Sequence, residues 1–558
     1  MSARTTADVV IGGGLLIDGT GAPARRADVA ITGGRVTEIG TGLRGRDELD
    51  ASGHVVAPGF IDIHTHYDAQ VFWDPALTPS CYHGVTTVVA GNCGFSLAPT
   101  RERHRDAVIK ILETVEDMNP ASLTEGIPWD FETFPQYLDA VARRPLVLNF
   151  AAYIGHTPLR LYVMGDDFDR AATPSELDAM KRLLHEAMVA GAAGFATSFG
   201  VLHQDSSGKP VPSRFADVHE MEALFGVLRD LGAGVVTVNP GGPCTYDALY
   251  ELQPKFGVPF TYGALLSEPD GSHVRRVEMN DDAWANGVKV WPQVTPRPVT
   301  VEFTMAQTSS LLAANPVFNE LTGRPLDARR AAFADAAFRS RLGAAFDVQR
   351  RLVPRWETYT VLASRNHPAL AGRHLVDIAA ERGVAPFEAL LDLALEDGDL
   401  STQIRGIVSN DDPEAVAALL VDEHCTLGLS DAGAHLAQLC DAAQATELLG
   451  LWVRDRAVMP IEQAVRKLSC VQADLMGFTD RGRLRPGTWA DVVVFDPDTI
   501  GPGPVRKVHD FPGGAARLTA DQPVGIAHVL VNGTPIRRDG EGVQGASAGQ
   551  VVRPAPAA

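Results

Sequence analysis

A short apolar run that ends in two histidines limits what this chain can fold into more than any other feature. The segment at 58–66 reads PGFIDIHTH, so one residue separates His64 from His66 after a strand-like stretch. In an extended strand, residues i and i+2 point to the same side, so both imidazoles project together from the strand end. Two imidazoles at this spacing suit a borderline divalent ion such as zinc. The other interpretation, a pair of exposed loop histidines, does not explain the apolar lead-in.

The middle of the chain alternates strand-like and helical stretches, which predicts an α/β fold built as a (β/α)8 barrel. Helical periodicity is found at 175–190, 218–231 and 411–421. The predicted barrel strands lie at 56–63, 86–90, 146–152, 194–198, 234–238, 259–264, 403–408 and 426–430. Barrel enzymes carry their chemistry where the strands end, which is where the two histidines stand.

Both ends of the chain consist of short β-rich segments between turn residues. We expect them to form one discontinuous β-sandwich domain, 1–57 plus 476–558, beside a barrel domain at 58–475. A stretch at about 266–400, which includes a β-rich run at 288–294, is too long for a barrel loop. It is predicted to be an insertion that caps the site. Residues 551–558 are expected to be a loose tail.

Composition narrows the class of protein. The 558 residues, 45% of them hydrophobic, can bury a large core and an accessory domain. A net charge of -20 argues against nucleic acid and anionic membranes as partners. The sequence contains no run of about 18 apolar residues, so we expect no membrane-spanning helix. Six cysteines without a CxxC pair, and an N-terminus unlike a signal peptide, indicate reduced thiols and a cytoplasmic location.

Six motifs spread over nearly the whole chain form a recognisable set. They are PGFIDIHTHYD at 58–68, GVTTVVAGNCGFSLAP at 84–99, GHTPLR at 155–160, PSRFAD at 212–217, SDAGAH at 430–435 and RGRLRPGTWADVVVFD at 481–496. Together they resemble the amidohydrolase superfamily and, within it, the N-acyl-D-amino-acid deacylase branch, which includes D-aminoacylases. The resemblance implies a metal-dependent hydrolase of the C–N bond in an N-acyl amino acid or related amide. Hydrolysis of a cyclic amide, lactone or carbamate, and a non-catalytic barrel, remain open alternatives.

Two further residues complete a predicted metal site. Cys93 lies in the GNCG turn after a β-branched strand, where a thiolate binds a metal strongly; a buried, inert cysteine is the alternative. The resemblance implies that Asp431 binds the metal and takes the proton from the attacking water; a helix N-cap is the alternative. His64, His66, Cys93 and Asp431 would hold one zinc ion per chain and leave a position for water.

The sequence also departs from the pattern that the resemblance implies. Deacylases of this branch place a histidine at the end of the fifth strand and another at the end of the sixth. Val238 and Ala264 stand at the aligned positions here. The lysine after the sixth-strand histidine and the HPR segment after the last-strand aspartate are also absent. We therefore expect no second metal and a weaker hold on a substrate carboxylate.

Other polar residues are candidates for catalysis or substrate binding. His156, just beyond the third strand, could polarise the substrate carbonyl or be a structural histidine. Arginine suits a carboxylate, although a structural ion pair is an equal explanation for each arginine. The candidate substrate-binding residues are His203, Ser213, Arg214, Arg297, His435 and Asn92. The expected partner is a small-molecule amide, and a homo-oligomer is left open.

Overall fold

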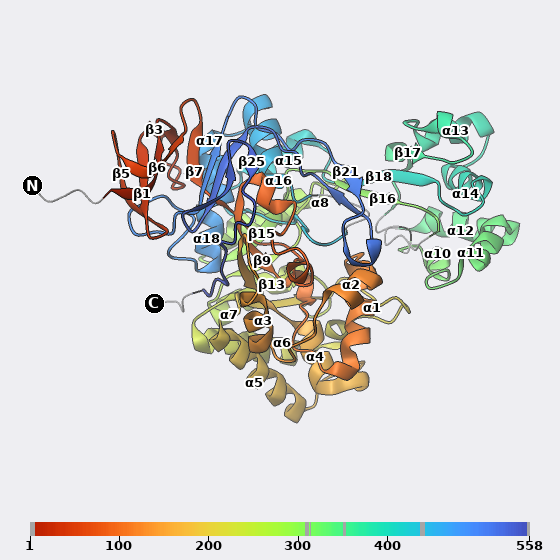
Figure 1. Ribbon diagram of the computed structural model, residues 1–558. Helices are drawn as coiled ribbons and strands as arrows, with labels where there is room; N and C mark the ends of the chain where they lie inside the picture. Colours follow the sequence, from red (N-terminus) through yellow and green to blue (C-terminus); the bar gives the residue numbers. More distant parts are fainter. Residues whose placement is uncertain (1–5, 307–311, 313, 350–352, 436–440, 555–558) are drawn as a thin grey trace, which may run out of the picture.

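The computed structural model describes residues 6–306, 312, 314–349, 353–435 and 441–554. The chain is an α/β protein in which helices surround a set of parallel strands (Figure 1). Two sheets built from the chain ends lie on one side, and a mainly helical insertion stands on the other. Among the described residues, no helix combines the length and apolar character that a membrane crossing needs.

The parallel strands form two separate sheets, named the first and the second arc. The first has the order β10 (Asn149–Ala152), β9 (Val85–Ala90), β8 (Phe60–Asp62). The second has the order β11 (Ile154–Gly155), β12 (Gly194–Ser198), β13 (Val235–Asn239), β14 (Phe260–Tyr262), β15 (Val290–Val294), β19 (Thr426–Leu427). An isolated parallel bridge pairs Thr65 with Ala432, just beyond β8 and β19. The carboxyl ends of these strands therefore meet in one region.

One of the eight predicted barrel strands is a strand, but it belongs to a different sheet. The run at 403–408 is β18 (Gln403–Ser409), which pairs antiparallel with β16 (Val299–Phe303) and β17 (Thr360–Ala363) inside the insertion. Its expected place is taken by β15, which the sequence assigned to the insertion. A short apolar run carries the same local signal in either sheet, and only long-range pairing decides between them.

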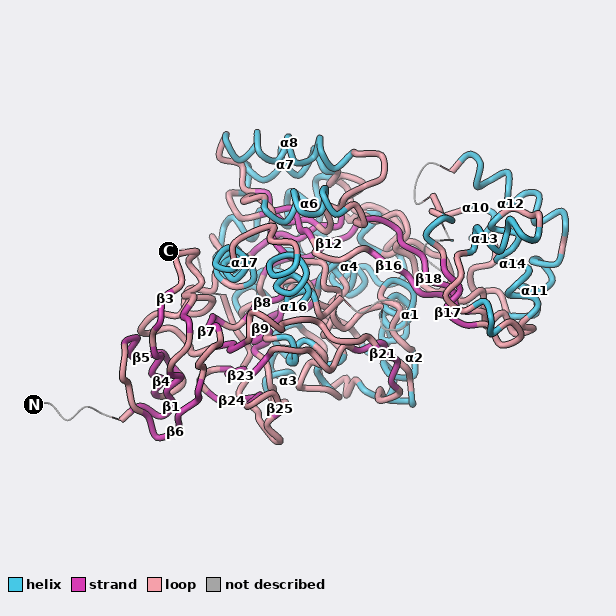
Figure 2. Tube along the Cα trace, turned by 90° about the horizontal axis from the view of Figure 1, so that it is seen from above, coloured by secondary structure: helices cyan, strands magenta, loops and turns pink. Residues whose placement is uncertain are grey.

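The insertion leaves the parallel sheet after β15 and returns before β19. Its helices are α10 (Pro316–Asn319), α11 (Leu326–Ala334), α12 (Ala336–Val348), α13 (Leu375–Arg382) and α14 (Pro386–Glu396). Phe318, Phe333, Leu342, Ile378 and Leu390 belong to a hydrophobic core that is separate from the main one. Both views place the insertion beside the body, to which β16 and β18 connect it (Figure 2).

Helices cover the parallel strands, and their ends follow local sequence signals. In α5 (Pro174–Ala190), Thr173 and Glu176 form a capping box and Gly191 ends the helix in a left-handed conformation. The helices predicted at 175–190, 218–231 and 411–421 are confirmed. The α-helices outside the insertion, among the described residues and besides α5, are α1 (Arg105–Val115), α2 (Pro120–Gly126), α3 (Phe134–Ala142), α4 (His156–Met164), α6 (Val218–Leu231), α7 (Tyr246–Phe256), α8 (Ser272–Ala285), α15 (Pro413–Val421), α16 (Gln444–Glu447), α17 (Ile461–Leu468) and α18 (Cys470–Met476).

The two chain ends share one sheet, because β20 pairs antiparallel with β7. This sheet has the order β25 (Glu541–Gly542), β24 (Thr534–Arg538), β23 (Ile526–Val531), β20 (Val492–Phe495), β7 (Val55–Pro58), β2 (Leu15–Leu16), β3 (Arg25–Arg26). A second sheet has the order β5 (Arg35–Gly40), β4 (Asp28–Thr32), β1 (Ala7–Gly12), β6 (Gly45–Asp50). Ile11 and Ile31 of the second sheet share a buried cluster with Val56, Val492 and Leu530 of the first.

Gly59 divides the strand that was predicted at 56–63. The residues before it form β7 in the terminal sheet, and those after it form β8 in the first arc. A Cβ atom on Gly59 would lie 2.3 Å from the Thr86 side chain, so only glycine fits at this crossing. The Gly59 N–H donates to the Asp491 carbonyl oxygen at 2.9 Å. The chain therefore passes from the terminal sheet through Gly59 and β8 to His64.

The segment before the C-terminus is not the loose tail that the sequence suggested. The Phe150 N–H donates to the Gln550 carbonyl at 2.9 Å, and the Val552 N–H donates to the Phe150 carbonyl at 2.8 Å. Val551 also pairs with Phe150 in a parallel bridge. The unpaired edge of β10 provides these partners, which the tail sequence alone does not reveal. Residues 555–558 lie outside the described residues.

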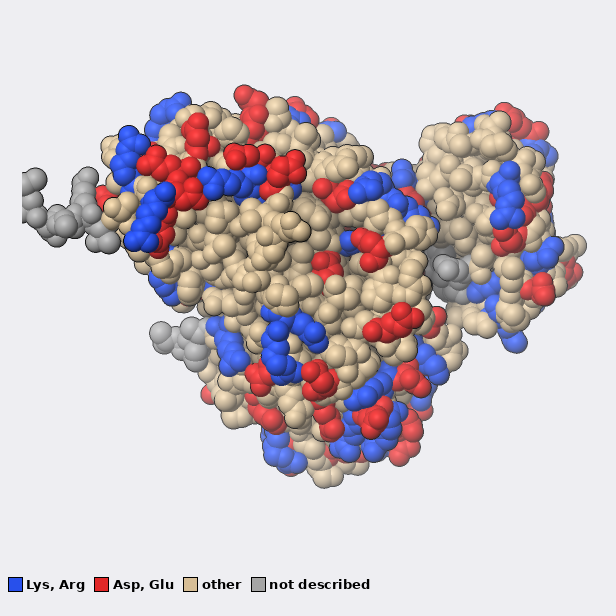
Figure 3. Space-filling view, in the orientation of Figure 1, with Lys and Arg blue, Asp and Glu red and all other residues tan. Residues whose placement is uncertain are grey.

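Charged side chains of both signs are mixed over the face in Figure 3, and neither sign gathers over a large area of it.

The five described cysteines are free thiols, and Cys440 lies outside the described part of the chain.

Asp491, which belongs to a buried ion pair and directly precedes β20, links the terminal sheet to the first arc. Arg481 Nη1 lies 2.5 Å from Asp491 Oδ2, with the side chains 2% and 3% exposed. Asp491 also accepts from Asn149 Nδ2 of β10 at 3.2 Å and from the Asn532 N–H at 2.8 Å. One carboxylate thus connects three segments that are distant in sequence.

We predict that Asp491→Asn lowers the free energy of unfolding by roughly 3–5 kcal/mol, because Arg481 loses its buried counter-charge. The matched change Asp480→Asn affects a half-exposed neighbour of Arg481 and should cost less than about 1 kcal/mol. Denaturant unfolding of both variants measures the difference. Equal losses would contradict the role of the buried pair.

Candidate metal centre

The four predicted metal ligands meet at one cavity of about 110 Å³, at the carboxyl ends of the parallel strands. The described lining residues are His64, His66, Cys93, Val115, Glu116, His203, Thr237, Val238, Asn239, Gly263, Leu429, Asp431 and His435. None comes from the predicted cap at 266–400, so the described part of that stretch does not wall the cavity.

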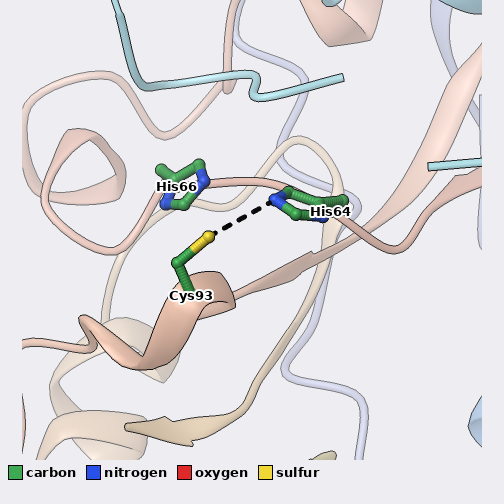
Figure 4. A group of neighbouring side chains, drawn as sticks. All are labelled: His64, His66 and Cys93. Carbon is green, nitrogen blue, oxygen red and sulfur yellow. Dashed lines mark hydrogen bonds between the residues drawn. The ribbon is translucent and has the colours of Figure 1, made fainter. Parts of the chain in front are cut away.

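The distances between the four ligands suit a single ion. Asp431 Oδ1 lies 3.1 Å from His64 Nε2 and 3.6 Å from His66 Nε2. Cys93 Sγ lies 3.9 Å from His64 Nε2 (Figure 4), and the ligand atoms of both histidines and Cys93 lie within 4.8 Å of one another. Two nitrogen or oxygen ligands of one tetrahedral zinc ion are about 3.3 Å apart, and a thiolate is about 3.6 Å from a nitrogen ligand. Small side-chain movements would therefore close this set around an ion.

The turn that carries Cys93 explains the residues on either side of it. Cys93 lies in a 3-10 turn with a φ of 53°, directly after β9. Gly94 has a φ of +77°, and a Cβ atom there would lie 2.7 Å from the Ala196 carbonyl oxygen. Asn92 Nδ2 donates to the Ile63 carbonyl at 3.1 Å. Asn92 thus connects the cysteine turn to the strand that precedes His64. A substrate contact, as predicted, would require Asn92 to line the cavity, and it is not among the described lining residues.

Four of the twelve non-glycine residues with a positive φ in the described part of the chain line this cavity. Cys93, Leu429, Asp431 and His435 line it, and their φ angles are 53°, 58°, 45° and 49°. Side chains rarely adopt this left-handed region, at a cost of about 1–3 kcal/mol each. Strain of this kind persists where surrounding contacts enforce it and often marks a functional site.

A chain of hydrogen bonds fixes the orientation of His64. The Thr261 hydroxyl donates to the Trp291 carbonyl at 2.7 Å, and Gln293 Nε2 donates to Thr261 Oγ1 at 3.1 Å. Gln293 Oε1 is therefore the acceptor that faces His64 Nδ1 at 2.5 Å. With its proton on Nδ1, His64 presents the Nε2 lone pair to the cavity.

The charges around the cavity favour a cation. Burial raises the pKa of the Cys93 thiol well above its usual value, and the negative charges of Glu116 and Asp431 raise it further. Burial also opposes ionisation of Asp431, but hydrogen bonds and attraction from His64 and His66 outweigh it and hold its pKa well below the usual range. No lysine or arginine is among the described lining residues. A bound metal ion would supply the positive charge that a thiolate needs.

Of the other candidate residues, His203 and His435 line the cavity, whereas His156 does not. The fully buried His156 ring contacts Thr197 Oγ1 through Nδ1 at 2.8 Å and Glu220 Oε1 through Nε2 at 2.7 Å. Both ring nitrogens are thus engaged within the protein, which matches the structural alternative for this residue.

Three more candidates lie away from the lining. Ser213 Oγ donates to the Ser198 carbonyl at 2.7 Å, and Arg214 Nη1 donates to the Val201 carbonyl at 3.0 Å. Arg297 Nε is 3.5 Å from Asp441 Oδ1. The structure does not bring these side chains to the cavity.

The structure adds lining residues that no predicted motif contains. Glu116, directly after α1, is 2% exposed at its side chain, and its one sequence signal is its position four residues after the buried Leu112. Val238 lines the cavity, as expected, but at the end of the sixth strand Gly263 does so rather than Ala264. A Cβ atom on Gly263 would lie 3.2 Å from His64 Cε1, so this position leaves room for the imidazole.

We predict that Gly94→Ala lowers the free energy of unfolding by about 2–4 kcal/mol, from the left-handed φ and the collision with the Ala196 carbonyl. Gly53 has a φ of +81° and nothing within 4 Å of its ideal Cβ position. Gly53→Ala is therefore the matched control for strain alone, at about 1–2 kcal/mol. Denaturant unfolding compares the two, and equal losses would count against the close packing of the cysteine turn.

Known proteins are similar to this chain over nearly its full length. The sequence is 29% identical over 557 residues to D-aminoacylase of Alcaligenes xylosoxydans xylosoxydans, covering 98% of this chain and 97% of that one. The crystal structure of N-acyl-D-glutamate deacylase from Bordetella bronchiseptica, complexed with zinc and a phosphonate inhibitor, matches with a TM-score of 0.67 at 29% identity, covering 98% of this chain and 100% of the other.

A solved D-aminoacylase matches with a TM-score of 0.68 at 27% identity, covering 98% of this chain and 99% of the other; its binuclear centre is described as activated by one metal and attenuated by the second. The amidohydrolase family matches residues 47–537. The chain therefore belongs to the amidohydrolase family.

Proposed function

We propose that this chain hydrolyses the C–N bond of an N-acyl amino acid or a closely related small amide, with one zinc ion held by His64, His66, Cys93 and Asp431. The observation that carries the proposal is the convergence of these four side chains at distances suited to one ion. Relatives named D-aminoacylase and N-acyl-D-glutamate deacylase, the latter solved with zinc, support the metal and the substrate class.

A zinc ion at this site would lower the pKa of a coordinated water and polarise the substrate carbonyl. Asp431 takes the proton from the attacking water and delivers it to the leaving nitrogen, so water and amide become carboxylic acid and amine. Asp431 is suited to this step because its side chain is 15% exposed, whereas the His64 and His66 side chains are 3% and 4% exposed. His156 lies outside the described cavity lining, so we assign the proton transfer to Asp431 alone.

Asp431→Asn should leave the fold intact and lower kcat by at least about 10²-fold, because the amide cannot accept the proton. Asp412→Asn is the control, since an asparagine there can still cap α15. Turnover of a panel of N-acetyl-D- and N-acetyl-L-amino acids provides the measurement. An Asp431→Asn enzyme with wild-type turnover would exclude Asp431 as the base.

A single ion is proposed because Val238 and Ala264 stand where the branch places histidines. Gly263, which lines the cavity at the end of the sixth strand, offers no side-chain ligand atom either. Protein purified without chelator should contain about one zinc per chain. Cys93→Ala should lose zinc and activity together, whereas Cys470→Ala, outside the described lining, should keep both. Elemental analysis gives the ratio, and a value near two would contradict a mononuclear centre.

A cyclic amide is a second candidate substrate. The absence of lysine and arginine among the described lining residues favours a substrate without a free carboxylate. Hydantoins and dihydropyrimidines added to the same panel distinguish the two classes, since the chemistry at the metal is the same for both.

We also propose that the two arcs of parallel strands are parts of one (β/α)8 barrel, and that the two terminal sheets pack as a sandwich formed by 1–57 and 476–558. The bridge between Thr65 and Ala432 and the hydrophobic cluster shared by the terminal sheets support this arrangement.

A further inference from the structure

A second carboxylate lies beside His66, at the ring nitrogen that Asp431 does not approach. Glu116 Oε1 is 3.4 Å from His66 Nδ1, whereas Asp431 Oδ1 is 3.6 Å from His66 Nε2. The Glu116 side chain is almost completely buried, and its Oε1 makes no hydrogen bond to the described residues. A buried polar atom without a partner is costly, so its position beside a predicted metal ligand needs a reason.

The backbone of Glu116 also joins two walls of the cavity. Its N–H donates to the Leu112 carbonyl at 3.1 Å, which continues the hydrogen bonding of α1. Its carbonyl accepts from the His435 N–H at 2.6 Å, and Glu116 Oε2 is 3.9 Å from His435 Nε2. One residue therefore contacts the rings of two cavity histidines and holds the turn that follows Asp431.

The two histidines of the HxH motif have different acceptors at Nδ1. Gln293, which is neutral and itself fixed by Thr261, faces His64. Glu116 faces His66. An imidazole that binds a metal through one nitrogen usually donates the N–H of the other to a carboxylate, carbonyl or water, which fixes the tautomer and makes the ligand more basic.

We propose that Glu116 is a positioning residue of the metal centre. In the metal-bound site its carboxylate, 3.4 Å from His66 Nδ1 in this structure, accepts the Nδ1–H and so presents Nε2 to the ion. The same residue holds His435 at the cavity wall. The inference rests on the metal site of the proposed function and is independent of which amide the chain hydrolyses.

The test uses metal-free full-length protein with Glu116→Ala, Glu116→Gln and the control Glu113→Gln, which changes a half-buried residue on α1. Zinc affinity is measured by competition with a chromogenic chelator, and the coordination of Co²⁺ is read from its visible absorption. Glu116→Ala should bind zinc about 10–100-fold more weakly. Glu116→Gln should lose less, because an amide oxygen still accepts the imidazole proton. Glu113→Gln should match the wild type.

Thermal melting of the metal-free protein separates positioning from a purely structural role. Metal-free Glu116→Gln should melt no lower than the wild type, because a neutral amide needs no counter-charge, while the visible spectrum of Co²⁺ in this variant keeps its wild-type form. Wild-type zinc affinity in Glu116→Ala would overturn the proposal. So would complete loss of the ion in Glu116→Gln, which would make Glu116 a direct ligand, or a lower melting temperature of that metal-free variant.

These measurements do not depend on hydrolysis. If no amide proved to be a substrate, the zinc affinities would still decide the role of Glu116. If the wild type bound no zinc, the metal site of the proposed function would fail, and the inference would be overturned with it.

Discussion

Acidic groups gathered around a small cavity need positive charge, and the organisation of the site follows from this need. Cys93, Asp431 and Glu116 lie together at the cavity, and the described lining offers only imidazoles to balance them. Without a cation, burial keeps the Cys93 thiol protonated and leaves Asp431 dependent on His64 and His66. A divalent ion would let the thiol and the carboxylate act as anionic ligands together. The same ion would then be the Lewis acid that amide hydrolysis requires.

The surrounding fold enforces a geometry that the local sequence does not favour. Left-handed backbone at Cys93, Leu429, Asp431 and His435 is unfavourable for each residue alone. Hydrogen bonds from these turns to neighbouring segments hold them in place: Asn92 donates to the carbonyl of Ile63, and the Ser430 hydroxyl donates to the carbonyl of His64 at 2.9 Å. Gln293 and Glu116 stand behind the two imidazoles. The ligands are therefore positioned by residues that bind no metal themselves.

The differences between expectation and structure have one common cause. The apolar run at 403–408 and β15 have similar local character, yet only β15 joins the parallel strands. Gly263 rather than Ala264 faces His64, because the direction of a residue at a strand end depends on how the strand leaves the sheet. Asn92 lies beside Cys93 in sequence, but its amide binds backbone carbonyls instead of facing the cavity. Sequence adjacency shows which residues are near a site and not which way they point.

The sequence by itself determined the family motifs, the alternation of strands and helices, and the four ligand candidates His64, His66, Cys93 and Asp431. These could be read because local patterns carry them: an HxH after an apolar strand, a cysteine between glycines and an aspartate after the last strand. Only the tertiary structure decided that the four meet at ligand distances, that His156 and the candidate arginines lie outside the cavity lining, and that Gln293 and Glu116 orient the imidazoles. Gln293 is 229 residues from His64 in sequence, and no local pattern specifies a hydrogen bond over that separation.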